Sequence, residues 1–463
     1  MKKILLLLIF HFSLFIFHSN AQQYWHRVKG GCGQAGAGDA VISLVVDSTN
    51  NLLYAGGNFN TIDNSIGCDA IGSWDGNNWS TNTSFNSNPS TKRIIFFQNM
   101  LFISSSTQND GGIFYNTGGS NWQNLANMNS QVQCLCIYHN KLYVGGDFTT
   151  VNGMSASFIA CYDGTNWNTL GSGIWCTQFP GHVTAMCVWN DKLIAGGSFD
   201  KAGGLTVHSV AAWNDTTWSD VGWGVVDSGA TNVADVYALC VHDSDLIVGG
   251  TISHADGLPV NNICRFNGSN WFALGAGVDA NVYSLLSFKG KLNVGGEFEI
   301  AGGISASRFA YWNDTTWATT YGGGVFNSVF AMAVYDSVLY IGGLFGYIGN
   351  VNCNHIAALY DYPDSSVSIN EVESSVESDA SILCYPNPSE DKFNIEVKNI
   401  QMDCEAILSI TDLLGKKLLE KSISLSKGNS NIDIKHQLPD GIYLVSLVTT
   451  QARLHSTIVV QKQ

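Results

Sequence analysis

The sequence has little positive charge. Its 463 residues include 22 lysines and arginines against 37 aspartates and glutamates, a formal net charge of −15 at pH 7. A protein that binds phosphate backbones needs clustered positive charge, so we exclude nucleic acid and anionic membrane surfaces as partners. We interpret the acidity as that of a solvated surface whose aspartates mostly stabilise turns, in preference to calcium binding.

Long hydrophobic runs are also scarce. One run, at residues 4–17, follows two lysines and leads into Ser19-Asn20-Ala21. This pattern is typical of a secretory signal peptide, so we expect residues 1–21 to be removed and the mature chain to begin at Gln22. No later segment is apolar for long enough to cross a bilayer as a helix, and we predict no transmembrane segment in the mature chain.

The cysteines lack the spacing of a metal site. The chain has 12 cysteines but no CxxC pair and no Cys/His cluster with zinc spacing, so we predict no metal site and no cofactor. Export would permit disulfides. Among the cysteines expected in loops, Cys32 has both Cys68 and Cys353 as possible neighbours, Cys176 is the fourth, and spacing does not choose a pairing.

The chain does contain an internal repeat. A short apolar run ends in a glycine pair, and a tryptophan segment follows some twenty residues later. One further copy, at residues 100–106, has serines in place of the glycines. The first tryptophan segment precedes every glycine pair, and no such segment follows the last pair. The glycine pairs begin at Gly56, Gly145, Gly196, Gly249, Gly295 and Gly342, and the tryptophan segments at Trp25, Trp79, Trp122, Trp167, Trp218, Trp271 and Trp317.

Each repeat predicts four antiparallel strands. The first strand of each repeat is apolar at both its odd and its even positions, as expected for a strand buried on both faces. We therefore predict an all-β fold in which residues 22–363 form a seven-bladed β-propeller closed by strands from both ends. In five repeats an aromatic residue and a tryptophan five positions later should meet across a hairpin: Trp74 and Trp79, Tyr162 and Trp167, Trp213 and Trp218, Phe266 and Trp271, Trp312 and Trp317.

The repeat resembles known propeller repeats. The pattern of KLYVGG, IACYDG and the following tryptophan segment is similar to kelch-type repeats and to those of Rax2-type cortical proteins and their bacterial secreted relatives. The resemblance implies the architecture. It implies little about function, because propellers carry many unrelated sites.

The composition changes after the repeats. Residues 364–381 are rich in serine, glutamate and valine and predict a linker. Residues 382–463 alternate strands with turns, which suits a small Ig-like β-sandwich. They resemble the type A C-terminal sorting domain of the type IX secretion system of Bacteroidota, through Tyr385, Pro386, Asn387, Pro388, Gly415, Lys416, Gly441 and Tyr443.

The resemblance to the sorting domain implies a partner and a cellular location. The partner would be the type IX secretion machinery. The protein would be secreted, or displayed on the outer-membrane surface of a Gram-negative bacterium, and the C-terminal domain would be removed during export.

Strand order predicts where a ligand would bind. In an up-and-down sheet, the loops joining strands two and three emerge at the same end as the loops joining successive units. These loops are long and variable here, the usual setting of a binding site, whereas the other end has tight turns. Our candidate ligand-binding residues are Trp175, His182, Trp223, Asp227 and Asp279. The tryptophans could stack on a sugar or simply pack over strand ends, and His182 could be merely solvated.

We favour a binding or adhesion protein with a glycan or protein ligand. The alternative is a polysaccharide-active enzyme, a glycoside hydrolase or a lyase. Residues 73–79 resemble a sialidase Asp-box but lack the residue between aspartate and glycine. No copper site of tyrosine and histidine can be assigned either, so we name no catalytic residue. Convergence of two or three carboxylates with aromatic residues on the loop face would discriminate the two functions.

Overall fold

The structure is a computed structural model that describes residues 23–33, 38–81, 90–106, 111–116, 122–229, 232–320, 324–349, 351–361, 381–385, 392–400, 403–412, 417–436, 438, 441–449 and 453–460. Every regular element among these residues is a β-strand. No helix in this described part could span a membrane. The chain divides into two compact units: one spans residues 22–362, and the described residues from 381 onward belong to the other.

The first unit repeats one antiparallel sheet, in which four strands pair in chain order. We number the sheets I to VII. Sheet I is β2 (Ala40–Asp47), β3 (Leu52–Asn58), β6 (Ile71–Trp74) and β7 (Trp79–Ser80); II is β8 (Ser90–Phe97), β9 (Met100–Ser106), β10 (Gly111–Asn116) and β11 (Trp122–Met128); III is β12 (Val132–Tyr138), β13 (Lys141–Gly146), β16 (Ile159–Tyr162) and β17 (Trp167–Thr169); IV is β19 (His182–Trp189), β20 (Lys192–Ser198), β23 (Val210–Trp213) and β24 (Trp218–Asp220); V is β26 (Asp235–His242), β27 (Asp245–Thr251), β30 (Ile263–Phe266) and β31 (Trp271–Ala273); VI is β32 (Val282–Phe288), β33 (Lys291–Gly296), β36 (Phe309–Trp312) and β37 (Trp317–Ala318).

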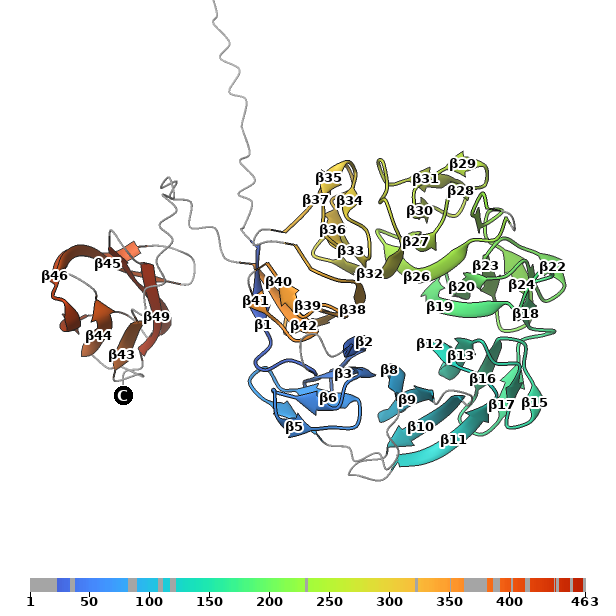
Figure 1. Cartoon of the computed structure of the whole chain (residues 1–463), viewed down its shortest axis with the longest axis horizontal. Helices are drawn as coiled ribbons and strands as arrows, with labels where there is room; N and C mark the ends of the chain where they lie inside the picture. The colour runs from blue at the N-terminus through green and yellow to red at the C-terminus, as the bar shows by residue number, and fades with distance from the viewer. Residues whose placement is uncertain are drawn as a thin grey trace, which may run out of the picture. The chain divides into compact units, whose positions relative to one another are not determined.

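Sheet VII combines strands from both ends of the unit. Its strands β38 (Val329–Tyr335), β39 (Val338–Gly343) and β42 (Ile356–Asp361) are followed by β1 (Gln23–Arg27), which pairs with β42 in the register Trp25 to Leu359. The first strand of each sheet contacts the first strand of the next, and β38 contacts β2 (Figure 1). The seven sheets thus form a ring.

Short hairpins extend the sheets at one end, between the second and third strands. One example is β28 (His254–Ala255) with β29 (Leu258–Pro259) in sheet V. The segment that arrives from sheet IV contributes β25 (Val225–Val226), which pairs with β28. Hairpins and unit-joining segments therefore share one end of the ring, which we call the loop face. The other hairpins on the loop face are β4 (Thr61–Ile62) with β5 (Ile66–Gly67), β14 (Thr150–Val151) with β15 (Met154–Ser155), β21 (Lys201–Ala202) with β22 (Leu205–Thr206), β34 (Ile300–Ala301) with β35 (Ile304–Ser305), and β40 (Tyr347–Ile348) with β41 (Val351–Asn352). The unit-joining strand β18 (Ile174–Trp175) pairs with β21.

The glycine pairs allow neighbouring sheets to approach closely. A Cβ atom on Gly249 would lie 2.6 Å from Cγ1 of Val282 in the next sheet, and one on Gly196 would lie equally close to Val236. Neither glycine has a positive φ. Close packing, and not turn geometry, is therefore what requires glycine at this point of the repeat.

The aromatic pairs predicted across the hairpins are confirmed. Trp213 and Trp218 have ring centroids 5.3 Å apart, and the other four pairs lie between 4.9 and 5.6 Å. The indole N–H of Trp218 donates to the carbonyl of Leu170 in the preceding unit, at 2.9 Å. The tryptophan thus packs against the third strand of its own sheet and connects that sheet to the preceding unit by a hydrogen bond.

The second unit has two sheets: β43 (Ser381–Tyr385), β44 (Lys392–Ile400) and β47 (Gly428–Lys435) form one, and β46 (Lys417–Leu425), β45 (Cys404–Asp412), β48 (Gly441–Thr449) and β49 (Arg453–Val460) form the other. Phe393, Leu408 and Tyr443 belong to a single buried cluster that contains side chains of both sheets. Tyr385 ends β43 and Gly441 begins β48. The motif residues Pro386, Asn387, Pro388, Gly415 and Lys416 lie outside the described residues.

Candidate functional site

Every first strand of the ring carries a β-bulge near its loop-face end. In sheet V the register with β27 shifts between Val236 and Ala238, which leaves Tyr237 as the extra residue. Such a residue has no ladder partner, and the bulge bends the strand and redirects the side chain. The bulged residues around the ring are Ile42, Lys92, Gln133, Thr184, Tyr237, Tyr283 and Phe330.

Three consecutive bulged residues are aromatic. The ring centroids of Tyr237 and Tyr283 lie 5.3 Å apart, and those of Tyr283 and Phe330 lie 5.5 Å apart. The planes are inclined at 56° and 59°, and all three side chains are partly exposed. Sheets V to VII therefore present a continuous aromatic row at the loop-face end of their first strands.

A carboxylate stands beside the start of this row. Asp235 Oδ1 lies 3.6 Å from His182 Nε2 of the preceding sheet. Its interaction with His182 holds the pKa of Asp235 below its usual value, so this group is ionised at neutral pH. Burial raises the pKa of Tyr237 to about 12, with the Asp235 charge adding to the rise. The phenol consequently keeps its proton and can donate a hydrogen bond.

A network of polar side chains lies next to the second aromatic residue of the row, Tyr283. Thr251 Oγ1 donates to Asn281 Oδ1 at 2.6 Å, and Asn281 Nδ2 donates to Glu297 Oε1 at 2.7 Å and to the Tyr283 hydroxyl at 3.2 Å. Burial is the main cause that raises the pKa of Tyr283. We define the rim site as His182, Asp235, Tyr237, Thr251, Asn281, Tyr283, Glu297 and Phe330.

The chemistry of the rim site suits neutral polar ligands. Aromatic faces pack against the C–H faces of sugars, while carboxylate and amide groups bind hydroxyls. The two carboxylates, Asp235 and Glu297, come from different sheets. A general acid needs a raised pKa, whereas the pKa of Asp235 is lowered.

Of the five sequence-predicted residues, only His182 belongs to the rim site. Trp223 lies on the segment joining sheets IV and V, is 68% exposed and stacks on His208 with ring centroids 5.9 Å apart. Trp175 is half-buried in β18, where it packs against the core between sheets III and IV.

The two aspartates among those five residues lie in the unit-joining segments. Asp227 directly follows β25. Asp279 accepts the backbone N–H groups of Glu299 and Ile300, each at 2.8 Å, so its carboxylate stabilises the adjacent loop.

Sequence reasoning missed the aromatic row although a signal was present. Tyr237, Tyr283 and Phe330 each stand twelve residues before the first glycine of their pair. The same slot holds Gln133 and Thr184 in the preceding units. This position is aromatic in three successive units and polar in the two units before them. Such a pattern indicates a functional site more strongly than a single unrepeated loop residue does.

Two family models match parts of the chain. "Secretion system C-terminal sorting domain" matches residues 383–461, and "Domain of unknown function (DUF5122) beta-propeller" matches residues 140–167. The first match confirms the sequence prediction of a type IX sorting signal, and the protein is secreted or displayed on the cell surface of Bacteroidota. The second is a propeller family and covers part of sheet III.

Other comparisons add little. No curated protein sequence matches the chain. A solved structure described as "Glycoside hydrolase" is similar at 6% identity and a TM-score of 0.28, over 94% of this chain and 98% of that one. Dimeric latent PorU from Porphyromonas gingivalis is similar at 9% identity and a TM-score of 0.18, over 96% of this chain, which spans 34% of that longer protein. Neither likeness is close enough to indicate an activity.

Proposed function

We propose that residues 22–363 are a seven-bladed β-propeller in which β1 completes the last blade. The ring of four-stranded sheets and the propeller-family match to residues 140–167 support this. Residues 1–21 would be a signal peptide, residues 364–381 a linker, and residues 382–463 an Ig-like sorting domain. The repeats would be of the kelch or Rax2 type.

We further propose that the exported protein binds a glycan at the rim site. One observation carries this proposal: three neighbouring bulged positions are aromatic, and they adjoin the carboxylates of Asp235 and Glu297. A sugar chain crossing sheets V to VII could stack on the rings while its hydroxyls bind the polar groups. A protein ligand is the alternative within the same binding function.

A polysaccharide-active enzyme is the second candidate function. It is favoured by the presence of two carboxylates beside aromatic residues, the arrangement from which glycosidases build an acid and a base. The lowered pKa of Asp235 weighs against it, because that carboxyl group would be a poor proton donor at neutral pH. Binding without turnover is therefore our conclusion.

A glycan array probed with the purified full chain tests the proposal. The Tyr283→Ala variant should lose about tenfold or more in affinity for any glycan that the wild type retains. Tyr347→Ala is the matched control, because Tyr347 is 46% exposed on the loop face but lies outside the rim site. Equal losses in both variants would refute the rim site, and release of new reducing ends would favour the enzyme.

A further inference from the structure

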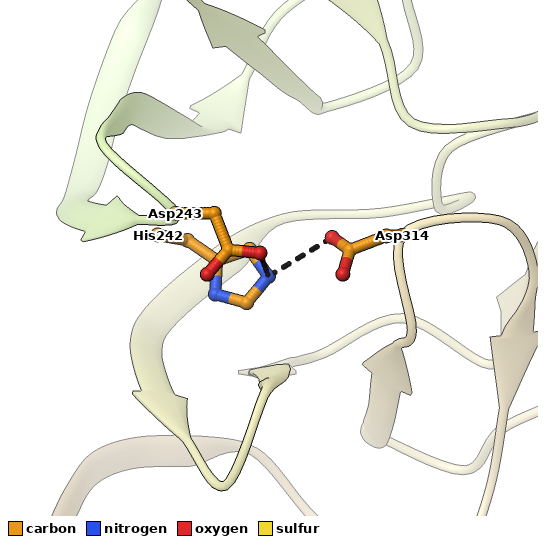
Figure 2. A group of neighbouring side chains, drawn as sticks. All are labelled: His242, Asp243 and Asp314. Atoms are coloured by element: carbon orange, nitrogen blue, oxygen red, sulfur yellow. Dashed lines mark hydrogen bonds and ion pairs between the residues drawn. The ribbon is translucent and has the colours of Figure 1, made fainter.

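A second cluster of polar side chains lies at the opposite, tight-turn end of sheets V and VI. His242 ends β26, Asp243 follows it in the turn, and Asp314 lies in the turn between β36 and β37 (Figure 2). His242 Nε2 lies 3.2 Å from Asp314 Oδ1 and 4.0 Å from Asp243 Oδ2. One ligand atom from each residue falls within 4.8 Å of the other two, so the three can share one ion.

The imidazole of His242 is held in one orientation. Its side chain is 4% exposed, and Nδ1 lies 2.8 Å from the Ser287 hydroxyl of sheet VI. A hydrogen bond at one ring nitrogen is the usual way in which proteins orient a histidine that binds metal through the other. Nδ1 can donate to the Ser287 hydroxyl, and in that tautomer the lone pair of Nε2 points toward two carboxylates. Ionised carboxylates only accept hydrogen bonds, so in that tautomer a cation between the three groups would satisfy the Nε2 lone pair and both carboxylates.

Among the described residues, the two carboxylates of the cluster have no lysine or arginine partner. In the part of the chain that the structure describes, no lysine or arginine forms an ion pair with Asp243 or Asp314. Both carboxylates are substantially exposed, at 66% and 53%, so a cation can reach them from solvent.

Another histidine at this end of the ring, His139 in sheet III, provides an internal comparison, although it occupies the position of Asp243, one residue after that of His242. There His139 has a carboxylate at each ring nitrogen: Asp215 at 2.5 Å from Nδ1 and Asp191 at 2.9 Å from Nε2. Lys141 Nζ adds an ammonium 2.9 Å from Asp215. The hydrogen bond with Asp215 is the main cause that raises the pKa of His139, so a proton and a lysine satisfy this cluster. In the His242 cluster, Nδ1 contacts the Ser287 hydroxyl instead of a carboxylate, and no lysine among the described residues pairs with Asp243 or Asp314.

We propose that His242 Nε2 and one oxygen each of Asp243 and Asp314 bind a divalent cation of the Zn²⁺ type. Imidazole suits Zn²⁺ better than Ca²⁺, which takes oxygen ligands only, and carboxylates complete a mixed set of donors. Three protein ligands leave one tetrahedral position for water or for a group on a partner. Because the ligands come from two sheets, the ion would also join sheet V to sheet VI.

This site differs from the zinc motifs whose absence led us to expect no metal. Those motifs group their ligands along a short stretch of chain. Here a single histidine meets a carboxylate 72 positions away in the sequence. Only the packing of one sheet on the next brings the donors together.

The sequence also supplies a well-matched pair of test variants. Sheets I, III and V have Gly76, Gly164 and Gly268 at the second residue of the last hairpin turn, all with positive φ. Sheets IV and VI have Asp215 and Asp314 there, with φ of 72° and 69°. Glycine is the residue that this backbone favours, so Asp314→Gly and Asp215→Gly should both fold.

Zn²⁺ binding by the chelator-treated full chain tests the proposal. Equilibrium dialysis with metal analysis should find one Zn²⁺ per chain for the wild type and for Asp215→Gly. Asp314→Gly should bind at least tenfold more weakly, and Asp243→Asn should lose affinity in the same direction. Visible spectra with Co²⁺ should show a mixed nitrogen and oxygen site in the wild type and in Asp215→Gly, but not in Asp314→Gly. Failure of the wild type to bind, or equal affinity of the Asp314→Gly and Asp215→Gly variants, would overturn it.

Discussion

The imidazole of His139 lies 2.5 Å from the carboxylate of Asp215, and this contact joins sheet III to sheet IV. Asp215 also accepts hydrogen bonds from Lys141 at 2.9 Å and from the Tyr143 hydroxyl at 3.0 Å. Asp191, from the same sheet as Asp215, faces the other ring nitrogen of His139. Two carboxylates, an imidazole and an ammonium group therefore meet at this one junction.

This junction predicts a pH dependence. The pKa of His139 is raised in the folded state, so its stabilisation is complete below the unfolded value of about 6.5 and is lost as pH rises through the folded pKa. Burial raises the pKa of Asp215, but hydrogen bonds outweigh this and lower it overall, so its own contribution is lost as pH falls through that lowered pKa. Thermal unfolding of His139→Gln should therefore differ most from wild type in mildly acidic buffer and least above neutrality. A difference that is constant across pH would contradict this.

Closure of the ring predicts the effect of a single N-terminal tryptophan. Trp25 is 6% exposed, packs edge-on against Phe309 with ring centroids 5.1 Å apart, and donates from Nε1 to Thr320 Oγ1 at 2.9 Å. Trp25→Ala should lower the free energy of unfolding by about 3–5 kcal/mol in urea titrations. Deleting residues 22–33 should open the ring altogether.

The exposed tryptophan supplies the control for that experiment. Trp223 is 68% exposed, so Trp223→Ala should change the free energy of unfolding by no more than about 0.5 kcal/mol. Similar losses in the two variants would mean that β1 does not hold the ring closed.

The glycine pairs predict a cost for one methyl group. Gly249→Ala would place a Cβ atom 2.6 Å from Val282 Cγ1 and 2.9 Å from Val282 Cβ, across the junction between sheets V and VI. Overpacking of this kind costs about 1–3 kcal/mol, measurable as a lower denaturation midpoint. Gly67→Ala is the matched control, since nothing lies within 4 Å of the added atom and φ is not positive. A neutral Gly249→Ala variant would show that neighbouring sheets can separate freely.

The export signals predict the ends of the mature protein. We expect mass spectrometry of culture medium and cell surface to find a chain that starts at Gln22 and ends within the 364–381 linker. The expectation rests on the proposed signal peptide and on the sorting domain matched at residues 383–461. A chain that reaches Gln463 outside the cell would rule out removal of the sorting domain.

The sequence predicted what depends on local order. Trp213 and Trp218 could be paired in advance because a tight hairpin connects them and fixes their register. The strand order at the two ends followed from the position of Trp25 before the first glycine pair. The sorting domain was predicted from short motifs that lie between Tyr385 and Tyr443, each readable from local sequence.

Contacts between sheets could not be obtained in the same way. The bulge that exposes Tyr237 was hidden, because a strand that is apolar at both parities gives no sign of which residue is extra. The approach of Asp314 to His242 depends on how one sheet packs on the next. The loop tryptophans were predicted as binding residues because they are large and have no counterpart in the other repeats. Of the five predicted residues, however, only His182 adjoins the aromatic row.

Trp223 provides the last prediction, because it separates a peripheral contact from the rim site. It is far more exposed than the rim tyrosines, and its neighbour in the structure is the ring of His208. If a long ligand extends from the rim site over the segment between sheets IV and V, Trp223→Ala should weaken binding by about 1 kcal/mol and leave stability unchanged. Short oligosaccharides that occupy only the rim site should bind this variant like wild type, while Tyr283→Ala should affect short and long ligands alike. Titration calorimetry over a series of chain lengths measures both effects, and a loss for Trp223→Ala that is independent of ligand length would place Trp223 within the primary site itself.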